Sequence, residues 1–200
     1  PVSRKNEMMN NFDWDNSFLV DFDLVTGLSN AAAPSERRLS KMKDMFHDTD
    51  AAAQILEIED PILYRWFELG APERAGDLAF GVTILNPGKV GDEYYMTKGH
   101  FHTMLETAEV YYTLSGEGYM IMEDPEGDTQ EQPLSKGQVV YVPRRYAHRM
   151  VNTGEQPLIT FFVFAADAGH DYGSIETKGY HKIVVEKDGK PAIVDNPKWV

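Results

Sequence analysis

The sequence predicts an all-β protein that folds as an antiparallel barrel or sandwich, with short helices near its N-terminus. From residue 62 onward the chain consists of short β-prone runs. Turn signals rich in Gly, Pro and Asp separate these runs, for example at 86–88, 115–118, 124–128 and 152–155. The sequence shows no tandem repeat, heptad run or low-complexity linker. Many short strands with regular turns are typical of barrels and sandwiches, and a single domain accounts for them.

The elements are expected in the following order. Residues 1–17 are polar with scattered aromatic residues and predict an arm, whereas 18–200 form one domain that begins with a short strand at 18–22. Apolar residues at spacings of three and four predict a helix over 35–46, and an acidic start predicts a second helix over 48–56. The remaining strands are expected at 62–69, 79–86, 92–97, 100–103, 109–115, 117–123, 138–142, 146–151, 158–164, 182–186 and 191–194.

Composition narrows the class of protein. At 200 residues with 42% hydrophobic content, the chain can bury a substantial core. Its net charge of −13 would repel nucleic acid and anionic lipid, which excludes nucleic acid as the main partner. The sequence has no run long enough to span a bilayer, no apolar segment after its polar beginning and no cysteine. We therefore expect a cytoplasmic protein without a membrane partner.

The stretch 98–109 carries a candidate metal site. His100 and His102 are two residues apart, and this spacing puts both imidazoles on one face of a strand. His148 lies in a second strand-like stretch that could run beside the first. Imidazoles with one carboxylate suit Fe(II), Mn(II), Ni(II) or Zn(II), and without cysteine nothing favours a structural zinc site. The residues alone leave Glu106 and Glu109 as candidate carboxylates.

Basic residues cluster around these histidines in the sequence: Lys98, Arg144, Arg145 and Arg149. On an acidic protein this local basic region favours an anionic small molecule as ligand. Each of these residues taken singly is typical of a solvated surface charge.

The same stretches resemble the two sequence motifs of the cupin superfamily. The first motif, His-x-His followed by Glu and then by Gly after six residues, matches His100, His102, Glu109 and Gly116. The second motif matches Gly137, Pro143, His148 and Asn152, with Arg145 at a glycine position. Only Glu109 keeps the motif's distance to Gly116, so the resemblance selects Glu109 over Glu106. It implies a cupin fold, which is a double-stranded β-helix or jelly-roll barrel.

A closer resemblance is to the cupin-type phosphoglucose isomerases of archaea and some bacteria. Matching strings run from about residue 18 to the end, among them 86–91, 97–102, 108–111, 139–143, 147–149, 166–173 and 194–199. The resemblance implies that glucose 6-phosphate and fructose 6-phosphate are interconverted with a divalent metal, usually iron, bound by His100, His102, Glu109 and His148. It further implies sugar-phosphate contacts at Tyr64, Thr83, Thr97, Gly99, Tyr111, His170 and Tyr172.

One position departs from this family. A tyrosine that is proposed to touch phosphate in the family is Phe164 in this sequence. Phosphate recognition needs hydrogen-bond donors, which the hydroxyls of Thr83 and Thr97 and the backbone of Gly99 can supply. Lys98 alternates with Thr97 and Gly99, so on a strand its side chain would point to the opposite face and would not bind phosphate.

The expected chemistry moves hydrogen between C1 and C2 of the sugar and protons between O1 and O2. A divalent metal stabilises negative charge on these oxygens as a Lewis acid. Glu109 would either act as the base of a cis-enediol route or only hold the metal during a hydride shift, and we favour the enediol route. His170 and Tyr172 are two residues apart, which is consistent with both entering the barrel mouth, for ring opening or hydroxyl positioning.

Two other functions are compatible with these residues, namely an iron-dependent cupin dioxygenase and a non-catalytic cupin that binds sugars. Isomerisation without oxygen uptake would exclude the first, and loss of activity on chelation would exclude the second. Cupin barrels often pair through edge strands and N-terminal arms, which cover exposed edges, so we expect a homodimer.

Overall fold

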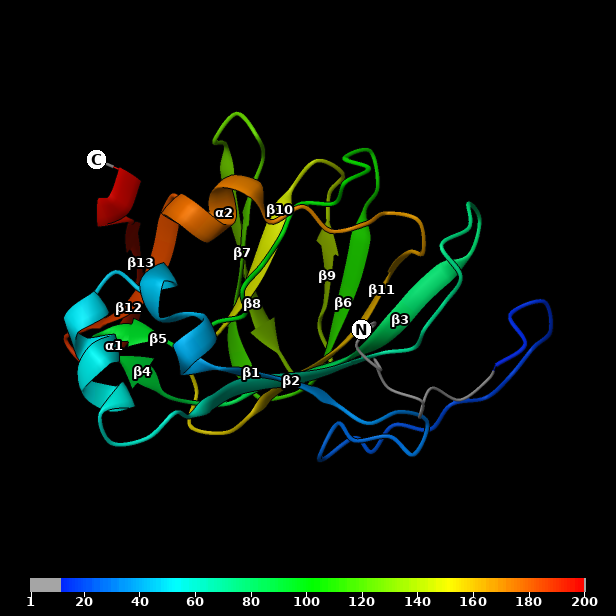
Figure 1. Cartoon of the computed structure of the whole chain (residues 1–200), viewed down its shortest axis with the longest axis horizontal. Coiled ribbons are helices and arrows are strands. Elements are labelled where there is room, and N and C mark those ends of the chain that lie inside the picture. The colour runs from blue at the N-terminus through cyan, green and yellow to red at the C-terminus, as the bar shows by residue number, and fades with distance from the viewer. Residues whose placement is uncertain (1–11, 200) are drawn as a thin grey trace, which may run out of the picture.

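The structure is a computed structural model that describes residues 12–199, and it consists mainly of antiparallel strands (Figure 1). A six-stranded sheet has the order β1-β2-β3-β11-β6-β9, a three-stranded sheet the order β10-β7-β8, and a four-stranded sheet the order β13-β12-β5-β4. The strands are β1 Ser35–Arg38, β2 Ile62–Glu68, β3 Leu78–Leu85, β4 Lys89–Val90, β5 Glu93–Tyr94, β6 Glu109–Ser115, β7 Glu117–Glu123, β8 Thr129–Ser135, β9 Val139–Val142, β10 Ala147–Asn152, β11 Leu158–Ala165, β12 Lys182–Lys187 and β13 Lys190–Asp195.

The predicted all-β fold is confirmed, with its strands arranged in three sheets. Across residues 12–199 the three sheets do not join into one closed hydrogen-bonded barrel, and their order is compatible with a jelly roll. Gly116 links β6 of the large sheet to β7 of the three-stranded sheet with a φ of 82°, a conformation that favours glycine. The chain thereby passes from one sheet to the other, and a cavity can form between them.

The main hydrophobic core lies between the sheets. Leu63 and Leu85 come from the six-stranded sheet, Met120 from the three-stranded sheet and Val184 from the four-stranded sheet, and each is at most 1% exposed. A smaller cluster, which includes Val82 and Ile84, packs on the outer face of the large sheet. Alternation along β3 thus sends Thr83 toward the inside and its neighbours Val82 and Ile84 toward the outside.

Residues 12–18 of the N-terminal region lie against this outer face. The rings of Trp14 and Phe18 lie 6.2 and 6.3 Å from the ring of Phe80 on β3. The strand expected at 18–22 is reduced to an isolated bridge between Phe22 and Ser29. Phe22 instead packs on Phe161, with ring centroids 6.0 Å apart. Residues 1–11 of the expected arm lie outside the described residues.

Of the two helices expected near the N-terminus, the second is confirmed and the first is wrong. Helix α1 spans Thr49–Leu56, and the Asp48 side chain caps it by accepting a hydrogen bond from the Ala51 N–H at 2.8 Å. Residues 35–38 form β1, because they pair with β2, and short 3₁₀ turns follow at Leu39–Lys41 and Lys43–Met45. The apolar residues that suggested a helix are buried all the same, since the turns point them into the core.

Strands β4 and β8, helix α2 and a last 3₁₀ turn also escaped the sequence analysis. Strand β8 is largely polar and exposed because it is an edge strand, and it pairs with β7 along its whole length. Helix α2, Gly173–Lys178, follows the 166–173 string, and a last 3₁₀ turn covers Pro197–Trp199. Figure 1 shows α1 beside the four-stranded sheet at one end of the molecule, while α2 crosses near β7 and β10. In residues 12–199 no helix has the length and apolar character needed to cross a membrane.

Candidate metal centre and substrate cavity

The structure brings four predicted metal ligands together. The ligand atoms of His100, His102, Glu109 and His148 all lie within 4.8 Å of one another. Glu109 is the first residue of β6 and His148 the second residue of β10, so the two come from different sheets. His102, Glu109 and His148 are each at most 4% exposed.

His100 and His102 converge, although the segment that carries them is not the expected strand. The segment makes isolated bridges, His100 with His148 and Phe101 with Asp171. Gly99 has a φ of +73°, which interrupts the extended backbone. Tertiary pairing to β10 on one side and to the loop at residue 171 on the other therefore holds the two rings, whose centroids are 5.6 Å apart.

Two neighbouring residues orient the histidine rings. Nδ1 of His102 lies 2.8 Å from the Thr107 hydroxyl, and that hydroxyl donates to the Met104 carbonyl at 2.7 Å. The hydroxyl oxygen therefore accepts from Nδ1–H, and Nε2 is left to face Glu109 at 3.0 Å. His148 is placed similarly, with Nδ1 3.4 Å from the Tyr146 carbonyl oxygen. Hydrogen bonds of this kind fix the tautomer and ring direction of metal-binding histidines.

The electrostatics of the cluster favour a neutral His100 beside an ionised Glu109. Burial, and then the neighbouring His148, lowers the pKa of His100 to about 2. Burial alone would raise the pKa of Glu109, but the neighbouring His148 and His102 outweigh it and hold this pKa well below its usual value. Burial opposes protonation of His148, whereas the Glu109 carboxylate favours it and raises the pKa of His148. A divalent cation would displace the proton of this pair.

This donor set fits a divalent metal ion. Nε2 of His148 lies 2.7 Å from Glu109 Oε2, yet in the described residues this buried nitrogen has no partner with hydrogen-bond geometry. A buried ring nitrogen without such a partner is costly unless it binds something else. Three imidazole nitrogens and one carboxylate oxygen suit Fe(II), Mn(II), Ni(II) or Zn(II).

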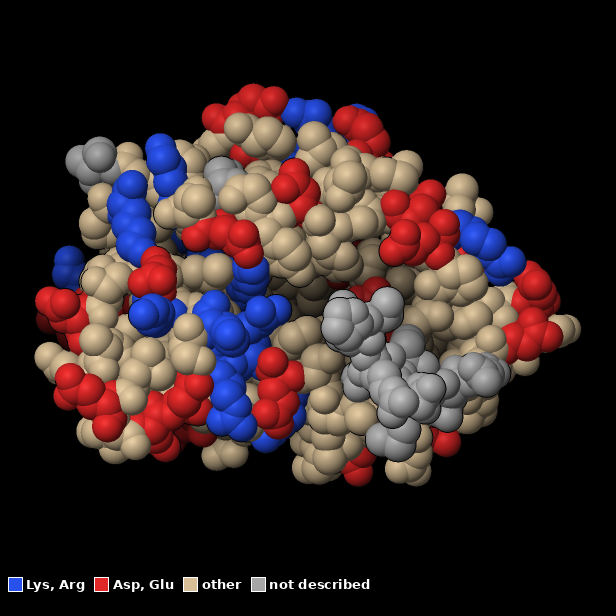
Figure 2. Space-filling view, viewed as in Figure 1, with Lys and Arg blue, Asp and Glu red and all other residues tan. Residues whose placement is uncertain are grey.

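A cavity of about 180 Å³ opens next to the cluster, and it is lined by all seven predicted substrate contacts: Tyr64, Thr83, Thr97, Gly99, Tyr111, His170 and Tyr172. Phe164 also lines it, with its ring centroid 5.8 Å from that of His102. Figure 2 shows a hollow on this face of the molecule, with Lys and Arg side chains gathered on one side of it.

The cavity also contains residues that the sequence analysis missed. Trp66 and Glu68 follow Tyr64 at two-residue spacing along β2 and share its cavity-facing side. Arg37 on β1 is paired with Tyr64 and lines the same cavity. The alternation of 64, 66 and 68 was visible in the sequence, but the placement of Arg37 was hidden behind the wrong helix prediction. Partial burial, and then the charges of Glu109 and Glu73, raises the pKa of Glu68 to about 7.

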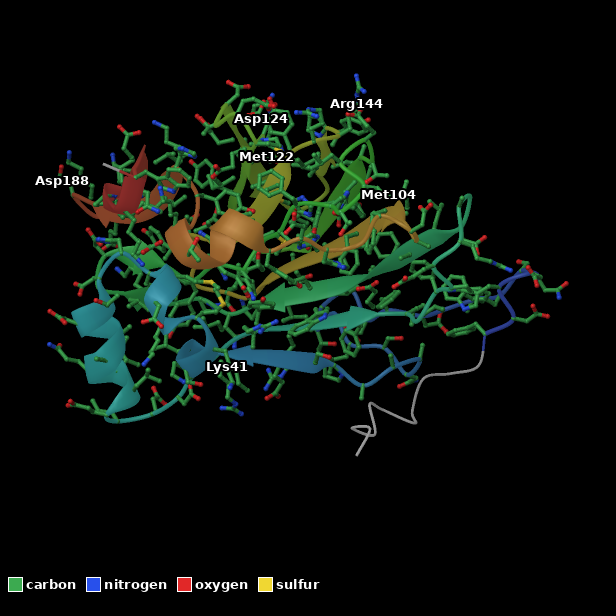
Figure 3. The ribbon with its side chains drawn as sticks, turned by 45° about the horizontal axis from the view of Figure 1, so that its top comes forward. Lys41, Met104, Met122, Asp124, Arg144 and Asp188 are labelled. Atoms are coloured by element: carbon green, nitrogen blue, oxygen red, sulfur yellow. The ribbon has the colours of Figure 1, made fainter. Side chains whose placement is uncertain are left out.

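The basic residues expected to cluster around the histidines lie in different surroundings in the structure. Arg149 is 2% exposed and donates from Nε to the Thr97 carbonyl and from Nη2 to the Lys98 carbonyl, both at 2.9 Å. Arg144, labelled in Figure 3, lies on the surface. It pairs with Glu106, and Arg145 pairs with Glu126 at 2.8 Å. Glu106 is thus a solvated carboxylate with a 59% exposed side chain.

Lys98 differs from its expected position. It lines the cavity, because residues 97–99 lie outside the regular strands and the alternation expected of a strand does not apply to them. Its ammonium group pairs with Glu176 of α2 and lies 4.1 Å from the centre of the Tyr172 ring. Lys98 therefore contributes to the cavity wall with its charge already partnered.

The family match and the sequence relatives agree on one family. Residues 36–198 match the family Glucose-6-phosphate isomerase (GPI). The chain is 48% identical to the glucose-6-phosphate isomerase of Thermococcus kodakarensis over 90% of this chain and 95% of that protein. It is also 48% identical to the enzyme of the same name from Pyrococcus furiosus, over 91% of this chain and 96% of that protein. A solved oxalate decarboxylase from Bacillus subtilis is similar at 23% identity and a TM-score of 0.41, covering 54% of this chain and 26% of that chain.

Proposed function

The chain belongs to the glucose-6-phosphate isomerase family, and we propose that it interconverts glucose 6-phosphate and fructose 6-phosphate in the cavity beside His100, His102, Glu109 and His148. The observation that carries this proposal is the convergence of four ligand atoms within 4.8 Å at the edge of a cavity with hydroxyl and amide donors. The metal is proposed to be Fe(II). When bound, it would stabilise negative charge on O1 and O2 of the sugar as a Lewis acid.

Glu109 is proposed to move the proton between C1 and C2. Its carboxylate is ionised at neutral pH and lines the cavity, so an oxygen of Glu109 can accept the proton from one carbon and return it to the other. Tyr111, two residues along β6, has its pKa raised well above the usual value by burial and by the Glu109 charge. Tyr111 therefore stays protonated and can donate a hydrogen bond to the carboxylate or to a sugar oxygen.

His170 and Tyr172 are proposed to open the sugar ring and to position its hydroxyls. Their rings are stacked with centroids 6.3 Å apart, and the His170 ring lies 4.3 Å from that of His100. Partial burial lowers the pKa of His170, so its imidazole is neutral at pH 7 and can accept a proton from a sugar hydroxyl. The homodimer and the cytoplasmic location stay predictions from the sequence.

Activity measured after metal removal and reconstitution tests the proposal. We expect a coupled assay on fructose 6-phosphate to lose its signal on exhaustive chelation and to regain it with Fe(II) or Mn(II), equally well without oxygen. Run in deuterated water, the enediol route predicts deuterium at C2 of glucose 6-phosphate. Activity that survives chelation would contradict the metal site, and full activity of Glu109→Gln would contradict the role of Glu109.

A further inference from the structure

The cavity wall offers neutral hydroxyl groups that could donate hydrogen bonds to a phosphate, and two of these hydroxyls already accept a hydrogen bond from the backbone. The Thr97 hydroxyl oxygen accepts from the Met150 N–H at 3.0 Å, and the Tyr64 hydroxyl oxygen accepts from the Lys98 N–H at 3.3 Å. Each hydroxyl therefore has one proton left to donate. Phe164 contributes no donor to the wall. A phosphate dianion in this cavity needs further donors, and a cation among them would serve best.

Three cationic side chains lie in or next to this part of the cavity, and two of them are committed. Lys98 pairs with Glu176. Arg149 is buried, and its guanidinium group donates to the backbone carbonyls of Thr97 and Lys98. Arg37 differs from both, because across residues 12–199 no carboxylate pairs with it, and its Nε is buried without a hydrogen-bond partner.

The position of Arg37 also fits phosphate. The β1–β2 register places Arg37 opposite Tyr64, and the β2–β3 register places Trp66 opposite Thr83, so Arg37 lies at the end of the cavity where the neutral donors are. Its guanidinium carbon lies 5.4 Å from the centre of the Trp66 ring, which holds the planar group against the wall. Arg38, the next residue, points to the opposite face and pairs with Glu36 at 3.3 Å.

We propose that Arg37 binds the phosphate group of the substrate by donating hydrogen bonds from its guanidinium group. The guanidinium fork matches two phosphate oxygens, and its charge partly offsets the repulsion of a dianion by the carboxylates Glu68 and Glu109 in the same cavity. Arg37 thereby selects for phosphorylated sugars over neutral ones. This proposal rests on the isomerase function given above.

The test compares Arg37→Gln with Arg37→Lys, using metal-loaded protein. Because a charge-assisted hydrogen bond is lost, we expect the KM for fructose 6-phosphate to rise about 10- to 100-fold in Arg37→Gln, with kcat changed by less than about threefold. The inhibition constant of inorganic phosphate should rise in parallel. For Arg37→Lys, both constants should lie between those of the wild type and those of Arg37→Gln. Metal content should stay the same, since Arg37 is not a ligand.

Arg38→Gln is the matched control, and its KM and phosphate inhibition should equal those of the wild type. Unchanged phosphate inhibition in a folded Arg37→Gln protein would overturn the proposal, as would a loss seen only in Lys98→Gln. A thermal unfolding scan identifies the folded variants. If Arg37→Gln does not fold, the phosphate inhibition of Arg37→Lys tests the proposal instead, and an inhibition constant equal to that of the wild type would contradict it. A wild type without isomerase activity would contradict the function itself, whereas an active Arg37→Gln with normal KM contradicts only the role of Arg37.

Discussion

At the scale of single residues, the direction in which a ring nitrogen of His102 points depends on a residue outside the candidate ligand set. His102 faces the cluster with Nε2 because Thr107 accepts from its Nδ1–H, and Thr107 is itself held by the Met104 carbonyl. The His-x-His spacing could be read from the sequence, but nothing in the sequence marks Thr107, because the turn that places it at hydrogen-bond distance belongs to the folded loop. The same holds for Tyr146, which contacts His148 through a backbone carbonyl that any residue would supply.

Replacing Thr107 with valine should weaken metal binding. Valine keeps the shape but removes the hydroxyl acceptor, which leaves His102 only the longer contact to the Thr107 carbonyl at 3.2 Å. We expect the affinity for Mn(II), measured against a competing chelator, to fall about 10-fold. Thr103→Val changes an exposed residue of the same loop and should have no effect. Equal affinities for both variants would show that Thr107 does not orient His102.

At the scale of elements, the sequence predicted the helices and strands whose own residues carry a clear pattern. It missed the strands whose residues lack such a pattern and that form because a neighbouring strand pairs with them. Helix α1 was predictable because Asp48 caps it and its neighbours favour helix. Residues 35–38 carry part of a helical pattern, yet pairing with β2 makes them a strand and brings Arg37 into the cavity. Strand β8 is polar because it lies at an edge. The convergence of His100, His102, Glu109 and His148 was expected from the motif resemblance, whereas the inward position of Lys98 reflects residues 97–99 lying outside the regular strands.

Gly99 should tolerate alanine poorly, for two separable reasons. Its φ of +73° is strained for any other residue, and an added Cβ would meet the Tyr180 hydroxyl and lie 2.8 Å from the His148 carbonyl oxygen. We expect Gly99→Ala to lower the free energy of unfolding by about 2–4 kcal/mol in urea titrations with chelator present. Gly137→Ala has a φ of +85° with nothing within 4 Å, so it should lose only about 1–2 kcal/mol.

Tyr180→Phe isolates the contribution of space at Gly99. It removes the hydroxyl that the new Cβ would meet, and this hydroxyl has no hydrogen-bond partner within the described part of the chain. Adding Tyr180→Phe to Gly99→Ala should therefore restore only part of the lost stability, since the φ strain and the contacts with His148 and with a ring carbon of residue 180 remain. Equal losses for Gly99→Ala and Gly137→Ala, without rescue, would mean that the backbone conformation alone matters.

At the scale of the whole molecule, the four candidate metal ligands come from segments that are distant in the sequence. His100 and His102 come from the segment between β5 and β6, Glu109 from the six-stranded sheet and His148 from the three-stranded sheet. A bound ion would join the two sheets at the edge of the cavity, where across residues 12–199 they do not share a continuous ladder. Metal binding should therefore stabilise the folded protein as a whole, because the unfolded chain cannot present these four ligands together.

Removing the metal should lower the melting temperature in a way that identifies the carboxylate ligand. At a free Mn(II) concentration of about 100 times the dissociation constant, binding contributes about 2.7 kcal/mol, which corresponds to about 5–10 °C for a chain of this length. We expect calorimetry to show this difference between loaded and chelated wild type and to show it unreduced in Glu106→Gln, whose side chain is solvated and paired with Arg144. Glu109→Gln should lose most of the difference, because a buried carboxylate oxygen of the cluster is replaced by a neutral amide.

Each variant is compared with its own chelated form, so effects of the substitution on the metal-free protein cancel. The opposite result, a difference lost in Glu106→Gln and kept in Glu109→Gln, would assign the ligand to Glu106 and place the metal outside the buried cluster.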